Sequence, residues 1–468
     1  MKKDFVSDAL RSGLSKAGSR VVRVCLWALS AAVFFVFARY ARYAMLDEYS
    51  DAYLMRNTLI TAGVYTAIFA LSYAVQLRAG RKLPVYAHIL LAVITGAVLL
   101  GKISLLDYVS DDYSIFLSDW IYNYSQMDVK QALGTYIQSD YTPPYLYILT
   151  MISRIRNFPW QYLVKAVSVA FEVLMAWSLM KLASLRVRGE GAQLLVYHIA
   201  LILPTVVFNG AYWGQCDVIY TSFCLSALYM GLKKRSAASM IFFGLGLSFK
   251  LQTVFFMPVM LPLWLRRDIK LRHLLLIPAT YMALMVPALW AGKSLHHVLT
   301  VYMQQAGNYN FISMNAPNLY QFLPDLDGAM LYKMFSPMAL VLGFAVVMAM
   351  CAIVSVYRDR LDEDSTLLAC LLMLGGIPLL LPKMHERYMF GADVLSLVLA
   401  VYSPRRILLP LCFGFASYVA YTAGLPGDKL MDLKFAAIFL MAGVALTGRE
   451  MWLALAKKTD KAFAEVKA

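Results

Sequence analysis

Long apolar runs separated by short polar stretches dominate the chain. A helix that crosses a membrane needs about 20 apolar residues, and this template predicts fourteen candidate spans. Their approximate bounds are 22–41, 57–77, 85–105, 160–182, 193–209, 217–231, 236–249, 252–265, 273–291, 336–356, 365–381, 388–402, 407–422 and 433–447. The pattern therefore predicts an all-α polytopic membrane protein, a bundle of about 14 transmembrane helices.

Two stretches depart from the simple alternation of spans and loops. Residues 106–147 form a long polar segment rich in acids and aromatics between apolar runs. It is followed by a short apolar segment, 145–155, closed by Arg154 and Arg156, which we expect to be an interfacial helix of the same loop. The run 236–264 is long for one span and short for two, with Lys250 and Gln252 in its middle, and predicts two short, broken helices.

Composition strengthens the membrane interpretation. The 468 residues are 60% hydrophobic and only 15% charged, and the mean hydropathy is +0.61, which excludes an ordinary soluble domain. The net charge of +15 does not indicate nucleic-acid binding, because the basic residues fall in short clusters between apolar runs. The six cysteines lack paired spacing, so neither a disulfide framework nor a zinc site is predicted.

The basic clusters predict orientation, since Lys and Arg favour the cytoplasmic side. With a cytoplasmic N-terminus, alternation of the spans leaves most Lys and Arg inside and both termini cytoplasmic. We expect the basic N-terminal stretch to precede a first membrane helix rather than a cleaved signal peptide. The predicted organisation is 1–105, a basic segment and three spans; 106–159, a large external loop; 160–448, the remaining bundle; and 449–468, a cytoplasmic tail. Further external loops are expected at 210–217, 292–335 and 382–388.

The external segments hold the candidate chemistry. Asp111 and Asp112 head the large loop, and a carboxylate in a partly desolvated cleft can act as a general base because burial and neighbouring acids raise carboxyl pKa values. The alternative is a pair of solvated loop acids. Trp213, Gln215 and Asp217 follow a span on the same face, although a boundary tryptophan also anchors helices and Asp217 could cap the next helix.

Basic residues in unusual places, inside an apolar run or in an external segment, are a second indication of a functional site. Lys250 lies in mid-run, where a lysine costs about 2.5 to 3.5 kcal/mol on insertion scales and usually faces a cavity. Lys383, His385 and Arg387 gather on the outside against the positive-inside trend, which suits an anionic ligand such as a phosphate. A juxtamembrane charge cluster is the alternative. His385-Glu386 lacks a second histidine at helical spacing, so no zinc-protease motif is present.

Four stretches in this order resemble one family: DYSIFLSDW with DYTPPYLY, then WGQCDVIY, SFKLQTVFF and PKMHERYMF. Across about 103–402 the chain is similar to bacterial GT-C glycosyltransferases of the mannosyltransferase-related, GPI-mannosyltransferase-like type. The resemblance implies a GT-C-like bundle and an inverting hexosyltransferase that uses a polyprenyl-phosphate sugar on the extracytoplasmic face of the plasma membrane. Asp112 matches the family's general base. Asp111 and Asp119 stand where a small residue and a proline are more usual, and the helical hairpin before the loop is extra, so the choice between Asp111 and Asp112 stays open.

The resemblance also assigns expected roles to the remaining polar residues. The donor phosphate would be bound by Arg387, His385, Lys383 and Lys250. The sugar or acceptor would be bound by Tyr113, Trp120, Asp140, Tyr141, Trp213, Gln215, Asp217, Gln252, Glu386 and Asn318. No metal site or cofactor is expected, and a divalent cation bridging an aspartate and the phosphate is left open. The expected partners are the lipid-linked donor, membrane lipid and a glycolipid, polysaccharide or protein acceptor, with no nucleic acid. A polyprenyl-linked sugar flippase and a non-catalytic polysaccharide-assembly subunit are the alternatives.

Overall fold

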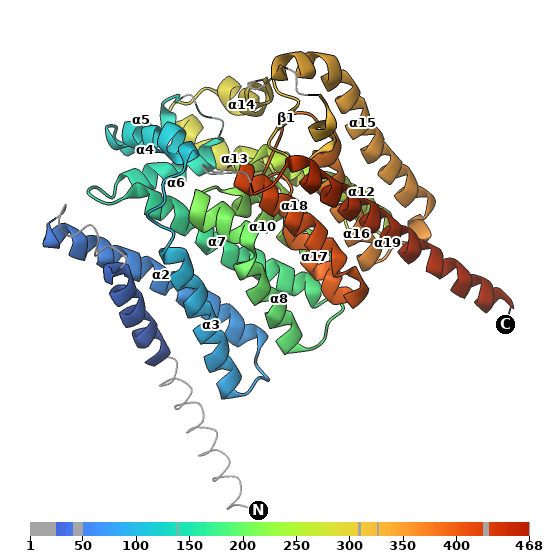
Figure 1. The fold of residues 1–468 in the computed structure, drawn as a ribbon, viewed down its shortest axis with the longest axis horizontal. Helices are drawn as coiled ribbons and strands as arrows, with labels where there is room; N and C mark the ends of the chain where they lie inside the picture. The colour runs from blue at the N-terminus through green and yellow to red at the C-terminus, as the bar shows by residue number, and fades with distance from the viewer. Residues whose placement is uncertain are drawn as a thin grey trace, which may run out of the picture.

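The computed structural model describes residues 25–40, 50–137, 139, 141–307, 310–324, 327–424 and 430–467. These residues are almost entirely helical (Figure 1). After a helix over Cys25–Tyr40, the longer helices are α2 (Asp51–Ala79), α3 (Val85–Ile103), α7 (Trp160–Ala183), α8 (Glu190–Ile202), α10 (Asp217–Leu232), α11 (Ser236–Phe249), α13 (Leu276–Trp290), α14 (Leu295–Gly307), α15 (Gly328–Val356), α16 (Glu363–Leu380), α17 (Phe390–Tyr402), α18 (Leu408–Gly424) and α19 (Leu433–Lys467).

Shorter elements connect them. The short α-helices are α4 (Ser118–Ser125), α5 (Val129–Gly134), α6 (Pro143–Ser153), α9 (Pro204–Val207) and α12 (Met260–Leu265). Two π-helical turns are η2 (Tyr113–Leu117) and η3 (Phe208–Trp213), and the 3₁₀ turns are η4 (Leu251–Phe255), η5 (Met257–Val259), η6 (Leu271–Leu275), η7 (Leu319–Phe322), η8 (Arg358–Arg360) and η9 (Pro404–Arg406). Two strands of two residues, β1 (Ser313–Met314) and β2 (Met384–His385), pair in parallel.

Within the described ranges, eight helices are long and apolar enough to cross a membrane, and the bent pair α8 with α9–η3 would make a ninth span. The protein is therefore an α-helical membrane protein by the length and composition of its helices. Every predicted span coincides with a helix or a run of short helices. Five of these helical segments are apolar but shorter than the 18 residues that a span requires: Cys25–Tyr40, Asp217–Leu232, Ser236–Phe249, Leu251–Leu265 and Phe390–Tyr402. The number fourteen stays a prediction.

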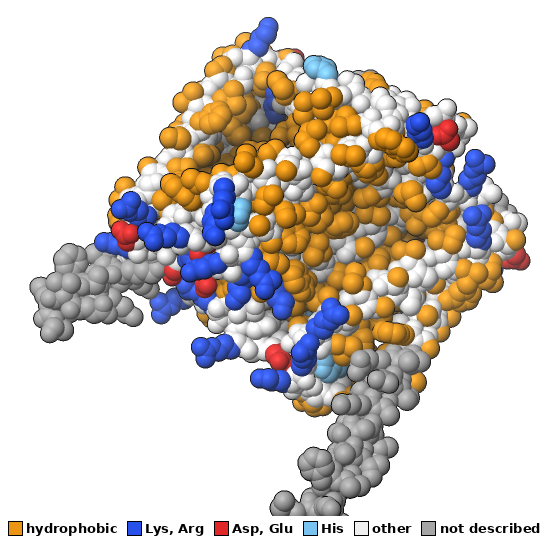
Figure 2. All heavy atoms as spheres, turned by 180° about the vertical axis from the view of Figure 1, so that it is seen from behind, with side chains coloured by type: hydrophobic (Ala, Val, Ile, Leu, Met, Phe, Trp, Pro, Cys, Tyr) orange, Lys and Arg blue, Asp and Glu red, His pale blue; other side chains and the backbone are white. Residues whose placement is uncertain are grey.

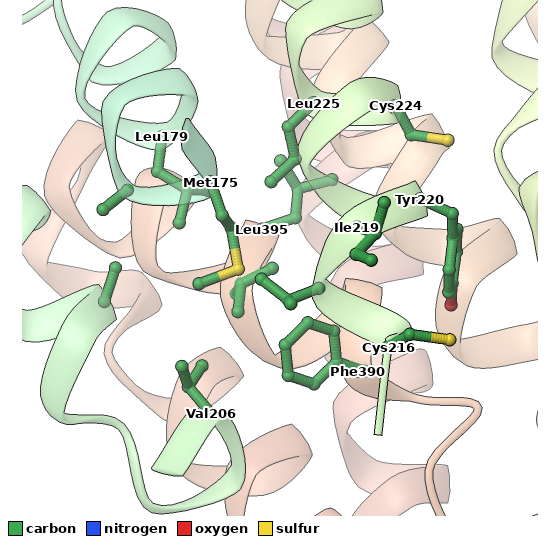
Figure 3. Close-up of a cluster of buried hydrophobic side chains, with 14 of the residues drawn as sticks. Met175, Leu179, Val206, Cys216, Ile219, Tyr220, Cys224, Leu225, Phe390 and Leu395 are labelled. Atoms are coloured by element: carbon green, nitrogen blue, oxygen red, sulfur yellow. The ribbon is translucent and has the colours of Figure 1, made fainter. Parts of the chain in front are cut away.

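The centre of the bundle is an apolar core between α7, α10 and α17. Figure 3 shows Met175 and Leu179 from α7 facing Ile219 and Leu225 from α10, with Leu395 from α17 closing the cluster. All five side chains are fully enclosed. A helix that is apolar on all sides is stable only when neighbours surround it, so α10 and α17 need no lipid-length span to be held in place.

The hairpin of α2 and α3 lies at one side of this core (Figure 1). It packs on α7 and α8, and a buried ion pair joins Lys102 of α3 to Glu172 of α7, with the ammonium nitrogen 2.6 Å from the carboxylate. Because α3 ends at Ile103, its last turn leads directly into the acidic loop. The position of that loop is therefore set by how α3 is fixed against α7.

Short helices gather at the end of the bundle that the acidic loop occupies. The segment between α3 and α7 folds into η2, α4, α5 and α6, and these lie at the same end as α14 and β1 (Figure 1). The segment 145–155 forms α6, which packs against α4, α11 and α13. The chain thus covers this end with a layer of short helices.

The outer surface fits an apolar environment. Figure 2 shows hydrophobic side chains over most of one face, with Lys and Arg side chains mainly along its margins. On α15, Val341, Phe344 and Met348 are each about two-thirds exposed. Such a broad apolar surface marks a membrane or protein contact region rather than a water-facing one.

Candidate functional site

A cavity of about 680 Å³ opens beneath the short helices, and segments far apart in the sequence form its walls. They are η2 and α4, the turn before α10, the break after α11, the strand β1 region and the connection between α16 and α17. The cavity is lined by eleven of the residues predicted for the site: Asp112, Trp120, Tyr141, Trp213, Gln215, Lys250, Gln252, Lys383, His385, Glu386 and Arg387. The folded chain therefore brings together most of the candidate chemistry.

Asp112 stands at the start of η2 with its carboxylate on the cavity wall. Its side chain is 34% exposed, and Oδ2 lies 3.6 Å from Nη1 of Arg387. The same oxygen accepts a hydrogen bond from the side-chain amide of Gln215. The amide donor and the guanidinium contact the same oxygen and orient the carboxylate at the cavity wall.

The turn that carries Trp213 and Gln215 is held by its own backbone. The π-helical turn η3 ends at Gly214, whose φ of +81° is a conformation that only glycine adopts without strain. The Gln215 amide then donates back to the Asn209 carbonyl at 2.8 Å, and Ser110 Oγ donates to the Trp213 carbonyl at 2.8 Å. π-Helical turns are rare and often occur at functional sites.

Asp217 lies behind the cavity wall and does not line it. Its side chain is completely enclosed, and it pairs with two cations that do line the cavity, Lys250 Nζ at 2.6 Å and Arg387 Nε at 3.6 Å. Asn209 Nδ2 donates a further bond at 2.9 Å. A buried charge is stable only when it is paired, and a carboxylate in the first turn of a helix is favoured by the helix dipole. Asp217 is therefore the counter-ion that fixes both cations.

Lys250 sits where α11 breaks. Its extended backbone, with φ −154° and ψ 138°, ends the helix and starts η4. The side chain is only 5% exposed, and Nζ lies 6.0 Å from the centre of the Tyr141 ring. The prediction of two helices broken at this residue is thus matched by the local structure, and Lys250 points to the cavity wall rather than to the surface.

Arg387 is surrounded by acids. Its Nη1 lies 2.8 Å from Glu386 Oε1, and its guanidinium lies 5.5 Å from the centre of the Trp213 ring. Burial disfavours the charged guanidinium, but Glu386, Asp112 and Asp217 more than offset this effect and raise the pKa of Arg387. Burial likewise raises the carboxyl pKa of Glu386, but hydrogen bonding by His385 and the charge of Arg387 bring that pKa below its ordinary value. Both side chains are therefore ionised at neutral pH.

The two short strands fix the segment that carries these charges. Lys383 N donates to the Ile312 carbonyl at 3.2 Å, and Glu386 N donates to the Met314 carbonyl at 3.1 Å. Lys383 adopts φ +62°, which turns the chain into β2, and its Nζ lies 5.0 Å from the centre of the Tyr332 ring. The long connection between α14 and α15 therefore lines the cavity and positions the adjacent segment with Lys383 and Glu386.

Four predicted residues do not line the cavity, and a fifth, Asp140, lies outside the described residues. Asp111 is exposed, and Tyr113 is buried, which raises its pKa to about 12. Asn318 is buried in the turn before η7, where its side chain accepts from the Tyr320 amide at 3.2 Å. Asp217 acts from behind the wall through the two cations that it pairs with.

Sequence patterns missed several contributors. Asn209, which holds Asp217, ends a predicted span eight residues before it, and this spacing was its only signal. Tyr332 lies near the end of the predicted loop 292–335, in what is now the first turns of α15, and Gln305 comes from α14. These two contribute through long-range packing, which no local pattern indicates.

Among the described residues, no group of three or more His, Cys, Asp or Glu side chains could hold a metal ion. The site instead offers two cavity-lining carboxylates, Asp112 and Glu386, two buried cations, Lys250 and Arg387, and aromatic walls. Such a site can bind a ligand that combines an anionic group with an apolar or ring-shaped part. The chain matches no protein-family model, and no curated protein matches its sequence significantly.

Proposed function

We propose that the protein is an inverting GT-C-type glycosyltransferase that moves a hexose, mannose-like, from a polyprenyl-phosphate sugar to an acceptor hydroxyl. The observation that carries the proposal is the pairing of Asp112 with Arg387, 3.6 Å apart on the wall of a 680 Å³ cavity. A base and an anion-binding cation in one enclosed space are what transfer from a phosphate leaving group requires.

Asp112 is the general base. Its carboxylate belongs to a residue that lines the cavity, and it can take the proton of the acceptor hydroxyl as the hydroxyl oxygen bonds to the anomeric carbon. The bond from that carbon to the phosphate oxygen breaks, and the electron pair leaves with the polyprenyl phosphate. Attack opposite the leaving group inverts the anomeric centre through an oxocarbenium-like state. Gln215 keeps the carboxylate oriented.

Arg387 and Lys250 stabilise the charge that develops on the leaving phosphate. Both are held before the ligand arrives, because Asp217 and Glu386 fix their positions. Charge stabilisation by groups that need no reorganisation usually contributes more to catalysis than any other single effect. Lys383 and His385 also line the cavity, where the lysine adds positive charge and the imidazole can donate a hydrogen bond to the phosphate.

The walls also suit the sugar and its lipid. Trp120, Tyr141 and Trp213 offer ring faces to a hexose. Phe116, Val254 and Leu340 also line the cavity and are 42 to 46% exposed, which gives an isoprenoid chain an apolar way out to the bilayer. The cavity volume falls within the usual range for small-molecule sites, about 300 to 1,000 Å³.

The membrane arrangement follows from the same proposal. Nucleotide sugars are cytoplasmic, so a transferase on the outer face needs a lipid-borne donor. We place the cavity on the extracytoplasmic side of the plasma membrane with both termini in the cytoplasm and about fourteen helices in the bilayer, because the basic clusters lie at the other ends of the helices.

The test is sugar transfer by the purified protein in lipid, with radiolabelled polyprenyl-phosphate hexoses as donors and native membrane extract as acceptor. Wild type is compared with Asp112→Asn and with Asp111→Asn, its matched control one residue away. We expect Asp112→Asn to lower transfer by about 10²- to 10⁴-fold and Asp111→Asn to retain it. Equal loss in both variants would contradict the assignment of the base.

One observation favours a second candidate, a transporter of lipid-linked sugars. The pair α8 and α9–η3 bends by 50°, and α11 breaks at Lys250, features common in transporters. The same preparation separates the two functions. A protein that moves the donor between leaflets without linking the sugar to any acceptor would be a transporter, and one that does neither would be an assembly subunit.

A further inference from the structure

One side of α7 holds the two segments that meet at Asp112. Lys165, in the second turn of α7, is buried, and its Nζ donates to three backbone carbonyls, of Leu105 at 2.7 Å, Leu106 at 3.2 Å and Tyr108 at 2.7 Å. An ammonium group has three donors, so each one is used. These carbonyls directly follow α3, whose carboxyl end carries unpaired acceptors and partial negative charge.

The next turns of α7 continue this contact. Ser168 Oγ donates to the Gln215 carbonyl at 2.6 Å, and Glu172 forms the ion pair with Lys102. Gly210 of η3 approaches so closely that a Cβ there would lie 2.6 Å from Glu172 Oε1. Spacings of three and seven residues put Lys165, Ser168 and Glu172 on one face of the helix. Through these contacts, this polar face of α7 holds both the segment after α3 and the segment before α10.

The segment after α3 and the segment before α10 also contact each other, through residues 108–112 and 212–215. The Tyr108 and Tyr212 rings stack with centres 3.8 Å apart, Ser110 donates to the Trp213 carbonyl, and Gln215 donates to Asp112. The stem of Lys165 packs against the underside of this junction, since its Cγ lies 3.6 Å from where a Cβ of Gly214 would be. The Lys165 ammonium therefore lies beneath the two segments that hold the Asp112 carboxylate in place.

We propose that Lys165 is a positioning residue that sets the place of Asp112 relative to Gln215 and the cavity. It touches no cavity-lining atom of the proposed reaction, so it acts through the Leu105–Tyr108 backbone. This role in catalysis rests on the proposed function, whereas the positioning itself does not. A shift of about 1 Å in a catalytic group can lower the rate about a hundredfold. Loss of three bonds to residues four, six and seven positions before Asp112 permits such a shift.

The experiment compares Lys165→Met, which keeps the stem and removes the ammonium, with Lys165→Arg, which restores a donor. Lys181→Met, near the other end of α7, is the matched control. Each full-length protein in lipid is assayed for kcat and donor KM, and amide hydrogen exchange is measured over peptides covering 105–117. We expect Lys165→Met to lower kcat about a hundredfold with donor KM within about threefold, and to speed exchange in 105–117. Lys165→Arg should recover part of kcat, and Lys181→Met should match wild type.

Each other outcome has a defined meaning. A wild-type kcat in Lys165→Met, or a rise in KM without a fall in kcat, overturns the proposal, and so does exchange in 105–117 equal to that of Lys181→Met. If Lys165→Met does not fold, Ser168→Ala takes its place, because it frees the Gln215 side of the same junction. If wild type transfers no sugar, the proposed function fails, and faster exchange confined to 105–117 in Lys165→Met still supports the positioning role.

Discussion

Two buried charge clusters lie at opposite ends of α16 and α17, and they are built differently. At the far end, Arg406 binds Asp364 through two parallel bonds of 2.6 and 2.9 Å and reaches Glu450 at 3.0 Å. At the cavity end, Arg387 is shared among Glu386, Asp112 and Asp217, and two of these three contacts are 3.6 Å long.

The difference in hydrogen bonding distinguishes a charge cluster that stabilises the fold from one that can bind a ligand. Arg406 makes short, directed bonds with both partners and does not line the cavity of the candidate site. At the cavity end, the side-chain oxygens of Gln215 and Gln252 and the Nε of Arg387 are buried without a hydrogen bond. Buried polar atoms are normally satisfied, and exceptions mark strain or a missing ligand. These atoms are therefore donors and acceptors that a bound ligand could use.

The largest difference between the two clusters should appear when the central acid of each, Asp217 or Asp364, is replaced. Asp217→Asn leaves Lys250 and Arg387 without their shared counter-ion, and Asp364→Asn removes one of the two carboxylates that pair with Arg406. Breaking a buried pair costs about 3 to 5 kcal/mol, so we expect both variants to lose that much unfolding free energy. Only Asp217→Asn should also abolish transfer. Thermal unfolding and transfer assays in lipid measure the two effects, and full activity in Asp217→Asn would contradict the distinction.

The two arginines give the next largest effect. Arg387→Met should lower transfer by about 10²- to 10³-fold, the cost of losing one preorganised donor to a developing oxyanion. Arg406→Met should leave kcat and donor KM unchanged while lowering the melting temperature. Kinetics of both variants, each normalised to folded protein, check this prediction. Similar losses of kcat would show that the far cluster also serves the reaction.

Acid should affect the cavity end through Glu386. The carboxyl pKa of Glu386 in the folded protein lies below the ordinary value of 4.5. As the pH decreases, the unfolded protein therefore takes up the proton at a higher pH than the folded protein does, and the free energy of unfolding decreases. The stabilisation by Glu386 is fully present above pH 4.5 and is lost as the pH falls through the lower folded pKa. Melting temperatures measured from pH 7 to pH 3 should fall less steeply in Glu386→Gln than in wild type. Parallel curves would mean that Glu386 is not stabilised as a carboxylate.

The smallest effect should come from Gly424 at the end of α18. A Cβ there would lie 3.0 Å from Glu386 Cγ and 3.0 Å from Trp213 Cη2, so Gly424→Ala pushes on the cavity wall. Overpacking of this kind costs about 1 kcal/mol at the low end, and we expect a several-fold rise in donor KM. Gly414→Ala is the control, because a Cβ in that position of α18 meets nothing within 4 Å.

The apolar pattern predicted the helices well because burial in lipid or protein depends on local composition. The span predicted at 85–105 is α3, Val85–Ile103, and the one at 217–231 is α10, Asp217–Leu232. The start of α15 was placed eight residues late, at 336. That helix begins at Gly328 because the Asp327 side chain caps the amides of Ala329 and Met330, a signal carried by one residue rather than by hydropathy.

The site was predictable where a residue type was unusual for its place. Lys250 was identified as a lysine in an apolar run, and Arg387 as a cation on the wrong side for the positive-inside trend. The same reasoning applied to Lys165 would have singled it out within the span 160–182, but its partners are backbone carbonyls some 60 residues earlier, which no motif reveals. Asn318 failed to reach the cavity because its side chain caps a local turn instead.

The pairing of β1 with β2 has an evolutionary consequence. The connection between α14 and α15 reaches the cavity wall through Met314 and Asn315, and at β1 main-chain bonds join it to the segment with Lys383 and Glu386. Such bonds form with almost any side chain. The side chains of Ser313 and Met314 can therefore be replaced without loss of these two bonds, while the charged groups of the neighbouring strand keep their places.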